Sequence, residues 1–434
     1  MFLAELTRRW DGDDHPFLVR GDARIRFKDL ISKEPPGVQA IGAGDAVAII
    51  GDFDHQSIAT LLHAIDRCAI IVPLSPQTRA QHEYFLDAAG IDVVIDGGVA
   101  TRRTHAFRHD YYDRLRAECH GGLVLFSTGT TGRPKAICHD LDTFLSRFAT
   151  PRPSLRTLGF LLFDHIGGIN TLLHVLYNRG TVVCPTERTV GAVLAACRDH
   201  DVEVLPTTPT FLRMLLLSGQ LPGGMPPAIR VITYGTERMD AGTLEELAAQ
   251  LPTVDFRQTY GMSEIGILRV KSEARGSLFM RVGGEGVETR VDDGSLRIRS
   301  ASRMLGYLNA PSPFDEEGWY DTRDLVELRD GWIRIIGRND DVINVGGLKF
   351  LASEVERAAL SLVEVAFARA RGCSNPLTGQ HVELDVQLRE QVTVSRDALR
   401  ACLEGVLAPH MVPRRIRVVD SLVGHRFKLG LDIR

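Results

Sequence analysis

The sequence predicts an α/β fold: a large N-terminal domain of sheets flanked by helices, with a small β-rich subdomain, and a small α+β C-terminal domain. Three observations support this prediction. Short apolar runs that end in Gly or Pro alternate with longer amphipathic stretches, shorter alternating segments begin near residue 280, and a compact tail follows Arg338. We therefore expect two domains, residues 1–338 and residues 339–434.

The alternation of strands and helices is clearest before residue 280. Each apolar run is short enough for a buried strand, and each following stretch has the period of an amphipathic helix. The expected strands cover 45–52, 121–129, 180–186, 203–208 and 229–235, and the expected helices cover 57–68, 190–200, 211–219 and 241–251. Because such sheets bind ligands at the carboxyl ends of their strands, we expect the functional loops at that edge.

The later segments indicate a different kind of structure. Residues 287–300 and 324–338 alternate apolar and polar side chains around Asp-Gly turns, which predicts two β-hairpins. The tail is predicted to contain helices at 353–362 and 395–407 and strands at 364–370, 381–389 and 414–422. This order is typical of a small α+β unit.

The composition is that of an ordinary globular protein. The 434 residues are 44% apolar, and 51 basic against 55 acidic side chains give a net charge of -4. No segment concentrates Lys or Arg with aromatic residues, so we expect neither nucleic acid nor an anionic membrane as a partner. No apolar run approaches the roughly 20 residues of a membrane helix, and no secretion signal is evident, which predicts a cytoplasmic protein. The seven scattered Cys residues show no disulfide or zinc pattern and are expected to be buried.

The segment STGTTGRPK, residues 127–135, follows a predicted buried strand. Gly129 and Gly132 allow consecutive N–H groups to point into one anion site, the hydroxyls add donors, and Lys135 adds a positive charge. The NTPase loop GxxxxGK[ST] is not matched, because Lys does not follow Gly132 and Ala136 stands where Ser or Thr would bind magnesium. The segment therefore predicts a phosphate loop of another kind, with a plain surface turn as the alternative and a kinase or motor ATPase disfavoured.

Four further motifs follow in order: YGTE at 234–237, QTYGMSE at 258–264, YDTRDL at 320–325 and GRNDDVINVGGLKF at 337–350. Together with the loop, they resemble the signature motifs of the adenylate-forming superfamily, which comprises acyl-CoA synthetases, luciferases and stand-alone adenylation domains. The resemblance extends over nearly the whole chain and is strongest to bacterial acyl-CoA ligase-like members. The family has Thr where this chain has Ser263 and Gly where it has Arg323.

This resemblance implies ATP-dependent activation of an aliphatic or aryl carboxylic acid. Family members join the acid to AMP, release pyrophosphate and pass the acyl group to a thiol of CoA or of a phosphopantetheinyl acyl or peptidyl carrier protein. The implied cofactors are ATP and Mg2+. One alternative is a non-catalytic nucleotide-binding relative, because Ser263, Arg323 and the C-terminal end depart from the family pattern. A second is an adenylation enzyme for amino acids.

The nucleotide site implied by the resemblance draws on several segments. Its residues are Ser127, Thr128, Gly129, Thr130, Thr131, Gly132, Lys135, Gly235, Thr236, Glu237, Thr259, Tyr260, Gly261, Ser263, Asp324 and Arg338. The resemblance assigns the β and γ phosphates to the loop, adenine to YGTE, and magnesium to Glu264, which also counts as catalytic. It assigns the ribose hydroxyls to Asp324 and the ribose or a phosphate to Arg338. The plainer alternatives are a helix cap for Glu264, a turn residue for Asp324 and a surface position for Arg338.

The C-terminal part supplies the remaining implied residues. Lys428 in HRFK is the counterpart of the family Lys that bridges the substrate carboxylate and the α-phosphate. His425 and Arg426 could replace it, and a solvated tail residue is the alternative. Asp340 matches the family hinge. The residues that would face the thiol after rotation are Asn344, Gly346 and Gly347, and a carrier protein would need a docking patch near Arg414, Arg415 and Arg417.

The segment FDHIGGIN, residues 163–170, resembles the floor of the carboxylate pocket. His165 is the implied catalytic and substrate-binding residue, and the other residues of the acyl site are Ile166, Gly167, Gly168 and Gly266. Ile166 occupies the position at which amino-acid-activating relatives place an Asp, which argues against an α-amino acid. An alignment shifted by two would place Asp164 there instead.

Overall fold

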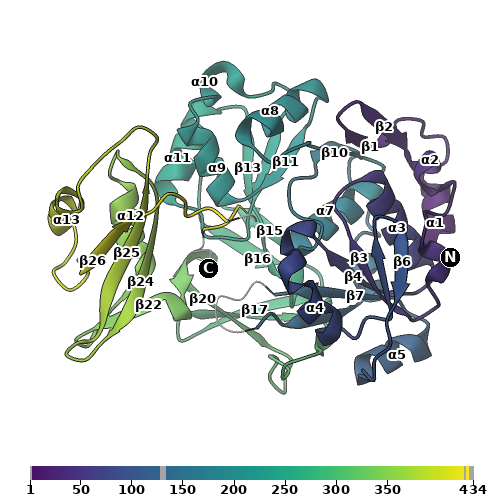
Figure 1. The fold of residues 1–434 in the computed structure, drawn as a ribbon. Helices are drawn as coiled ribbons and strands as arrows, with labels where there is room; N and C mark the ends of the chain where they lie inside the picture. Colours follow the sequence, from purple (N-terminus) through teal and green to yellow (C-terminus); the bar gives the residue numbers. More distant parts are fainter. Residues whose placement is uncertain (1, 128–132, 425–426, 430–434) are drawn as a thin grey trace.

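The computed structural model describes residues 2–127, 133–424 and 427–429, and it confirms the α/β class (Figure 1). The strands of these residues form three seven-stranded sheets and one five-stranded sheet. Two of the large sheets have parallel centres and stack with helices between them and outside them. The third large sheet is antiparallel, and the five-stranded sheet belongs to the C-terminal part.

The β3 sheet has the order β19-β8-β7-β4-β3-β5-β6, and β7, β4, β3 and β5 run parallel at its centre. Its strands are β3 (Ala46–Ile50), β4 (Ile70–Leu74), β5 (Val93–Asp96), β6 (Val99–Arg102), β7 (Gly122–Phe126), β8 (Ala136–Asp140) and β19 (Gly306–Tyr307). The central strands are continuous apolar runs because both faces of the sheet are covered. As expected, β7 leads directly into the segment 127–135.

The β11 sheet has the order β13-β12-β11-β9-β10-β1-β2 and is parallel except at β2. Its strands are β1 (Pro16–Arg20), β2 (Ala23–Arg26), β9 (Arg156–Leu158), β10 (Thr181–Cys184), β11 (Val204–Thr207), β12 (Val231–Tyr234) and β13 (Asp255–Gln258). Thr207 is in register with Tyr234, and Tyr234 with Gln258. The carboxyl ends of β11, β12 and β13 therefore lie side by side at one edge.

Helices cover both faces of both sheets. α3 and α7 pack in the apolar core that the two sheets share, α8, α9 and α11 cover the outer face of the β11 sheet, and α4 and α5 cover that of the β3 sheet. The helical segments of this part are α1 (Phe2–Arg9), α2 (Phe27–Ile31), η1 (Val38–Ala40), α3 (His55–Asp66), η2 (Pro76–Gln81), α4 (His82–Ala88), α5 (Asp110–Glu118), α6 (Leu141–Ser146), α7 (Ile166–Tyr177), α8 (Val190–Asp199), α9 (Pro209–Leu217), α10 (Leu221–Gly224) and α11 (Ala241–Gln250). Side chains cap several of them; Thr208, for example, accepts from the Phe211 N–H at 3.1 Å.

The antiparallel β20 sheet has the order β14-β15-β16-β21-β20-β18-β17. Its strands are β14 (Tyr260–Met262), β15 (Gly266–Ser272), β16 (Met280–Gly283), β17 (Val287–Asp292), β18 (Ser295–Ser300), β20 (Tyr320–Arg329) and β21 (Trp332–Arg338). Both hairpins expected from the sequence are confirmed, as β17/β18 and β20/β21. In the second hairpin Asp324 lies directly opposite Arg338, which brings these two predicted site residues together.

The C-terminal sheet has its own apolar core against α12 and α13. Its elements, with the short helical turn that precedes them, are η3 (Asn339–Asp341), β22 (Val342–Val345), β23 (Leu348–Leu351), α12 (Ala352–Leu360), β24 (Val365–Asn375), β25 (Gly379–Leu388), α13 (Arg396–Glu404) and β26 (Arg415–Val418). All five elements expected in the tail are present, although β24 continues past its expected end at residue 370. The boundary between residues 338 and 339 stays a prediction.

The C-terminal sheet meets the rest of the molecule beside α9. Arg213 Nε donates to the carbonyl oxygen of Ala366 at 2.6 Å, and Leu422 and Phe367 pack in one cluster with Met214. Figure 1 shows the C-terminal segment, in yellow, running from β26 back to the centre of the molecule. This return path brings the end of the chain to the edge at which the parallel strands end.

Two whole-chain expectations can be compared with the structure. All seven Cys residues are free, but only Cys138, Cys184 and Cys197 are buried as expected, and Cys68 and Cys373 are partly exposed. Cys119 and Cys402 are exposed. They lie at the end of α5 and within α13, on the sides of these helices that face water. Among the described residues, no helix combines the length and the apolar character that a membrane crossing requires.

Candidate active site

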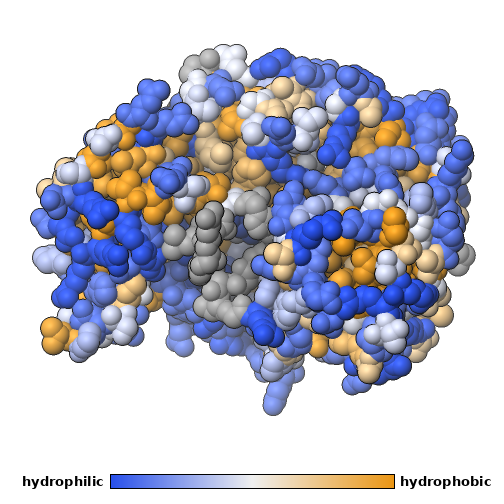
Figure 2. All heavy atoms as spheres, viewed as in Figure 1, coloured by the Kyte–Doolittle hydropathy of each residue, from blue (hydrophilic) through white to orange (hydrophobic). Residues whose placement is uncertain are grey.

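The carboxyl ends of β7, β11 and β12 open into a cleft of about 1400 Å³ that the β20 sheet and the C-terminal sheet also line. Figure 2 views the molecule from the side on which the C-terminal sheet, at the left, and the part that contains α4, at the right, face each other. Most predicted site residues line this cleft: Ser127, Lys135, His165, Ile166, Gly167, Gly235, Thr236, Glu237, Thr259, Tyr260, Gly261, Ser263, Glu264, Asp324, Arg338, Asp340 and Lys428. Residues from the whole length of the chain therefore share one cavity.

The ends of the predicted phosphate loop are held together by hydrogen bonds. The Ser127 N–H donates to the Lys135 carbonyl at 3.0 Å, and Ser127 Oγ accepts from the Lys135 N–H at 2.9 Å. Asn309 Oδ1 accepts from the Ala136 N–H, and the Tyr84 hydroxyl donates to the Pro134 carbonyl. The predicted residues Thr128, Gly129, Thr130, Thr131 and Gly132 lie outside the described residues, as do His425 and Arg426.

Glu264 lies between β14 and β15, so the alternative of a helix cap is wrong. Its carboxylate accepts from the Tyr307 hydroxyl at 2.8 Å. Burial, followed by the charge of Glu264, raises the pKa of Tyr307, which therefore remains a donor at neutral pH. The Lys135 ammonium stands 4.8 Å from the centre of the Tyr307 ring. Tyr307 thus links the lysine after the loop to the predicted magnesium ligand.

Sequence reasoning missed Tyr307 and Asn309, which lie in the short segment GYLNAP between the two predicted hairpins. It also missed His139, because a lone His on a buried strand is usually a core residue. In the structure, His139 Nε2 donates to the carbonyl oxygen of Ser263 at 2.7 Å. A carbonyl oxygen can only accept, so this nitrogen carries the proton. This hydrogen bond holds the backbone after β14, directly before Glu264, in place.

The stability of the protein is expected to fall in acid partly through His139. Burial lowers the pKa of this imidazole to about 4, although the bond to Ser263 acts in the opposite direction. Because the unfolded pKa is 6.5, the unfolded state binds a proton that the folded state rejects as the pH falls below that value. Between pH 7 and pH 4.5 this costs about 2.5 kcal/mol of unfolding free energy.

Urea unfolding of the wild type and of His139→Gln at these two pH values measures this contribution. The variant should lose less stability on acidification than the wild type by about that amount, since glutamine does not titrate. An equal loss in both proteins would contradict the assignment.

Asp324 and Arg338 form a buried acceptor group with Tyr260. Asp324 is 7% exposed and accepts from the Tyr260 hydroxyl at 2.7 Å and from Arg338 Nε at 2.9 Å. Burial, and then the Asp324 charge, raise the pKa of Tyr260. Burial acts to lower the pKa of Arg338, but the Asp324 charge outweighs it and raises that pKa. Asp324 is therefore not a turn residue, and its carboxylate retains lone pairs for further donors.

Arg323 occupies a backbone conformation that suits the glycine of the family motif. Its φ is +61°, in the left-handed region, and its N–H donates to Asp321 Oδ1 at 2.9 Å. The side chain reaches the predicted hinge residue Asp340, with Arg323 Nη2 3.1 Å from Asp340 Oδ1. The substitution therefore adds an ion pair across the predicted hinge and leaves Asp324 in place.

The segment predicted to contact adenine is held by the start of the next motif. The Thr259 N–H and hydroxyl both donate to the Tyr234 carbonyl, at 2.7 and 3.1 Å. Thr236 adopts a φ of +72°, so the chain turns sharply between Gly235 and Glu237. A β-carbon on Gly235 would stand 2.2 Å from Thr259 Oγ1 and 2.7 Å from its carbonyl oxygen. Glycine is therefore required where these two segments meet.

Replacing Gly235 with Ala is expected to lower the unfolding free energy by about 1–3 kcal/mol, because the added methyl group overlaps backbone as well as side chain. Thermal unfolding measures the effect. Gly242→Ala is the matched control, because its β-carbon meets nothing nearer than Asp240 Oδ2 at 3.4 Å and Ala favours the helix. Equal stability of the Gly235 variant and the wild type would contradict the predicted collision.

On the acyl side, His165 caps α7 by accepting from the Gly167 N–H at Nδ1, at 3.0 Å. Ile166 lines the cleft, whereas Asp164 is 5% exposed and is not among the lining residues. This arrangement supports the alignment that keeps His165 in place. Gly168 and Gly266 do not line the cleft: a β-carbon would meet the Leu162 carbonyl oxygen at 2.0 Å in the first case and Arg147 Nη1 at 2.4 Å in the second. Both glycines instead permit close packing beside it.

The C-terminal segment enters the cleft between α7 and the YGTE segment. Lys428 lies there together with His165 and Thr236. Phe427 packs against the rings of Phe160 and Phe211, at centroid distances of 5.0 and 5.9 Å.

The backbone of this segment is also held in place. The Phe427 carbonyl accepts from the Thr208 hydroxyl at 2.7 Å, and the Leu429 N–H donates to Glu237 Oε1 at the same distance. Glu237, predicted beside adenine, thus also contacts the tail, and burial raises its pKa.

The residues predicted to face a thiol lie away from this cleft. Asn344, Gly346 and Gly347 form the exposed turn between β22 and β23, and Asn344 Oδ1 accepts from the Gly347 N–H at 3.0 Å. The φ angles of the two glycines, +61° and +91°, lie in the left-handed region. In this arrangement of the chain they do not meet Lys428 or Lys135.

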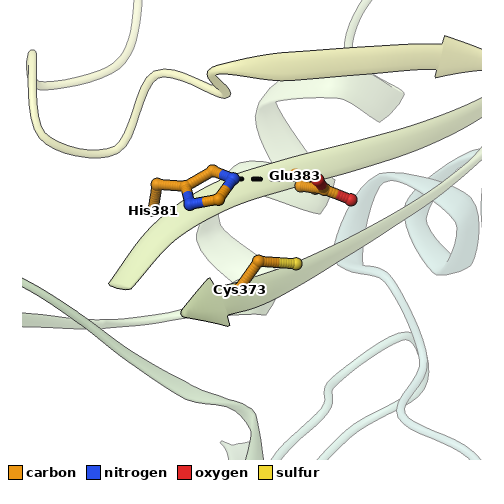
Figure 3. Close-up of side chains that lie close together, drawn as sticks. All are labelled: Cys373, His381 and Glu383. Carbon is orange, nitrogen blue, oxygen red and sulfur yellow. Dashed lines mark ion pairs between the residues drawn. The ribbon is translucent and has the colours of Figure 1, made fainter. Parts of the chain in front are cut away.

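Cys373, His381 and Glu383 form a cluster on the C-terminal sheet that the sequence did not indicate (Figure 3). Their possible ligand atoms lie within 4.8 Å of one another. Glu383 Oε2 already accepts from Arg371 at 2.8 Å, and Arg417 stands 3.6 Å away. Two guanidinium groups would repel a divalent cation, so the cluster is better described as part of an ion-pair network.

Comparison with known proteins gives consistent results. Residues 121–308 match the family model described as AMP-binding enzyme. The chain is 28% identical to a 3-[(3aS,4S,7aS)-7a-methyl-1,5-dioxo-octahydro-1H-inden-4-yl]propanoyl:CoA ligase of Rhodococcus jostii, over 69% of this chain and 61% of that one. It is 24% identical to a mitochondrial malonate–CoA ligase of Bos taurus, over 94% and 86%. A medium/long-chain-fatty-acid–[acyl-carrier-protein] ligase of Mycobacterium tuberculosis is 28% identical, over 70% and 59%.

Solved structures share the fold over almost the full chain. ATP-bound MatB from Rhodopseudomonas palustris superposes with a TM-score of 0.81 at 21% identity, covering 97% of this chain and 96% of that one. An anthranilate CoA ligase in complex with anthranoyl-AMP gives 0.82 at 18% identity, covering 99% and 95%. The chain spans 61% and 64% of the length of the first two curated relatives it matches.

Proposed function

We propose that this chain, which belongs to the adenylate-forming superfamily of AMP-dependent ligases, activates a carboxylic acid with ATP and then transfers the acyl group to a thiol. One observation carries the proposal most strongly. The cleft collects Lys428 from the end of the chain, Lys135 after the loop, and the Asp324–Arg338 pair of the β20 hairpin. This set offers positive charge for phosphates and a buried carboxylate for hydroxyl groups.

In this proposal ATP lies along the carboxyl ends of the parallel strands. Ser127, the loop and Lys135 bind the β and γ phosphates, since backbone N–H groups and an ammonium suit an anion. Asp324 accepts the ribose hydroxyls, while Arg338 holds Asp324 in place and donates to the ribose or a phosphate. The YGTE segment contacts adenine through Gly235 and Thr236.

Glu264 is the proposed Mg2+ ligand. Magnesium is usually held by one or two carboxylates together with substrate phosphates and water, so a single carboxylate beside the phosphate loop fits it. The Tyr307 hydroxyl fixes the orientation of this carboxylate. When bound, the ion would neutralise phosphate charge.

The proposed reaction joins two anions. A carboxylate oxygen of the acid forms a bond to the α phosphorus, and the bond from that phosphorus to the pyrophosphate oxygen breaks. Positive charge must therefore be in place before the carboxylate and the phosphate approach each other. Lys428 supplies it beside His165, which lies at the start of α7 and would contact the acid carboxylate.

Transfer to the thiol would follow a rotation of the C-terminal part about Asp340, which would bring Asn344, Gly346 and Gly347 to the cleft. The acceptor would be CoA or a phosphopantetheinyl carrier protein; relatives of both kinds are found. Within the basic run Arg417 is engaged, because its Nε donates to Asp385 at 2.5 Å, whereas Arg414 and Arg415 are exposed. CoA is the acceptor we favour, since two of the three curated relatives named above are CoA ligases, and a pool of ATP and CoA makes the cytoplasm the expected location.

Acid-dependent exchange of pyrophosphate into ATP tests the proposal. The assay should use a panel of aliphatic, aryl and amino acids, with ATP binding measured separately by calorimetry. Exchange that depends on an aliphatic or aryl acid is the expected result. ATP binding without exchange for any acid would instead indicate a non-catalytic nucleotide-binding protein, and exchange restricted to amino acids would overturn the proposed substrate class.

A further inference from the structure

The cleft continues beyond His165 as a channel between α7 and the inner face of the β11 sheet. Asn170, His174 and Asn178 line it at intervals of four residues, which places them on one side of the helix. We call these three residues the polar stripe. Leu172, Leu173 and Leu176 of the same helix are at most 1% exposed, whereas His174 is exposed. The channel is therefore wide enough to admit water along an otherwise apolar helix.

The opposite wall of the channel is also partly polar. Thr157 of β9 and Thr233 of β12 line it together with Val204 and Val231. Gln258, at the end of β13, lines the same cavity, and its Oε1 is buried with no hydrogen-bond partner in the part of the chain that the structure describes. A buried acceptor without a hydrogen bond costs free energy, which indicates that a donor from outside the described residues, such as a ligand or water, bonds Gln258 Oε1.

The side chains of the polar stripe differ in how many of their hydrogen-bonding groups are paired with other residues of the protein. Both ends of the Asn178 side-chain amide are hydrogen-bonded within the protein. Its Nδ2 donates to the His174 carbonyl at 2.7 Å, and its Oδ1 accepts from the Arg152 N–H. His174 Nδ1 is 3.4 Å from that same Nδ2, and no described residue bonds its Nε2. The Asn170 amide makes no hydrogen bond within residues 2–127, 133–424 and 427–429. Asn170 and His174 thus retain donors and acceptors for a ligand.

The charges around the channel favour a neutral ligand. Although water reaches the His174 side chain, the protein around the imidazole partly desolvates it and lowers its pKa, and Arg152 lowers that pKa further, so the imidazole is neutral at neutral pH. Arg257, at the far wall, is paired with Asp255 at 2.6 Å. None of the described side chains that line this stretch is acidic. An ammonium group would lack a partner here, and a second carboxylate would find no unpaired cation along the stripe.

We propose that the acid activated by this protein carries neutral hydrogen-bonding groups along its chain, such as a keto, hydroxyl or amide group, rather than a plain alkyl chain. This inference rests on the proposed function and names its substrate class. From the helix rise, Asn170 lies about 4.5 Å and His174 about 10.5 Å along α7 from Gly167, at the carboxylate end. A polar group on the acid is expected at each of these two depths.

The physical basis is the cost of covering polar groups with an alkyl chain. A plain chain would displace water from Asn170, His174 and Gln258 and return no hydrogen bonds. Sites built to bond a polar substituent reject the analogue that lacks it, because their own polar groups are left unpaired. One hydrogen bond typically corresponds to a factor of about ten in kcat/KM.

The test compares octanoic acid with 4-oxooctanoic acid and 8-hydroxyoctanoic acid in wild type, Asn170→Leu and His174→Leu, by pyrophosphate exchange. The leucine variants keep similar volume and favour the helix. The wild type should prefer the substituted acids at least tenfold. Asn170→Leu should reduce the preference for the oxo acid about tenfold, and His174→Leu the preference for the hydroxy acid. Thr171→Val is the matched control, since the Thr171 hydroxyl already bonds the Gly167 carbonyl, and should leave both ratios unchanged.

A second readout keeps this inference separate from the proposed activity. The rise in Tm on adding each acid with ATP measures binding even where no exchange occurs, and folded variants are identified in the same scan. A larger rise with the substituted acids supports the inference by itself. Preference for octanoic acid in the wild type, or ratios that the leucine variants leave unchanged, overturns it, while exchange with any acid still supports acid activation.

Discussion

Replacing Lys428 with Ala is expected to lower acid-dependent pyrophosphate exchange by about 10²–10³-fold, the usual effect of removing one donor that stabilises a developing oxyanion. Lys428 is the only residue of the C-terminal tail segment 427–429 whose side chain carries a charge, and it reaches the cleft beside His165. An ammonium about 4 Å from an anion gains about 4 kcal/mol at an effective dielectric constant of 20, before desolvation. The rate should fall mainly in kcat, because the charge is needed when the two anions meet.

Two controls make this result specific. Lys349→Ala removes an exposed lysine of the C-terminal sheet and should leave exchange unchanged. In the Lys428 variant, thioester formation from a preformed acyl-adenylate should remain within a few-fold of the wild type. If exchange persists at the wild-type rate in Lys428→Ala, the assignment is wrong, and His425 or Arg426 becomes the residue to replace next.

Replacing Asp324 with Ala should weaken ATP binding about 10²–10⁴-fold and also destabilise the protein. Loss of two charge-assisted hydrogen bonds to the ribose, each about 1.5–3 kcal/mol, accounts for the affinity. The Tyr260 hydroxyl and Arg338 lose their acceptor at the same time. A buried hydroxyl left without a partner costs about 1–3 kcal/mol of unfolding free energy.

Asp324→Asn separates these two effects, because the amide oxygen can still accept from Tyr260 while the charge is lost. Its stability should lie nearer the wild type, whereas calorimetry should show ATP affinity reduced in both variants. Asp330→Asn, at the exposed turn of the same hairpin, is the matched control for affinity. Wild-type ATP affinity in Asp324→Ala would remove Asp324 from the proposed nucleotide site.

The contacts of the tail bear on the proposed rotation of the C-terminal part. Phe427 lies against Phe160 and Phe211, and the Thr208 and Glu237 hydrogen bonds hold the backbone on either side of Lys428. A rotation that brings Gly346 and Gly347 to the cleft would have to break these contacts and the Arg323–Asp340 ion pair. The described arrangement is therefore the one suited to the first half of the proposed reaction.

Much of the fold could be predicted from the sequence, because strand and helix periods are local. The runs at 45–52, 180–186 and 229–235 became β3, β10 and β12, and the Asp-Gly turns placed both hairpins correctly. The motifs likewise placed Asp324 and Arg338 in one hairpin, where cross-strand register makes them neighbours. Gly168 and Gly266 were less well placed, because a motif does not show which neighbouring surface a glycine packs against. That Asn344, Gly346 and Gly347 face a thiol after rotation stays a prediction.

The sequence by itself determined the α/β class, the order of the elements and the family motifs, because those depend on residues within a few positions of one another. Only the tertiary structure decided that Lys428 lies beside His165, that His139 supports Ser263, and that Arg323 pairs with Asp340. It also decided that one side of α7 lines a polar channel. These contacts join residues far apart in the chain, and packing alone determines which distant side chains meet.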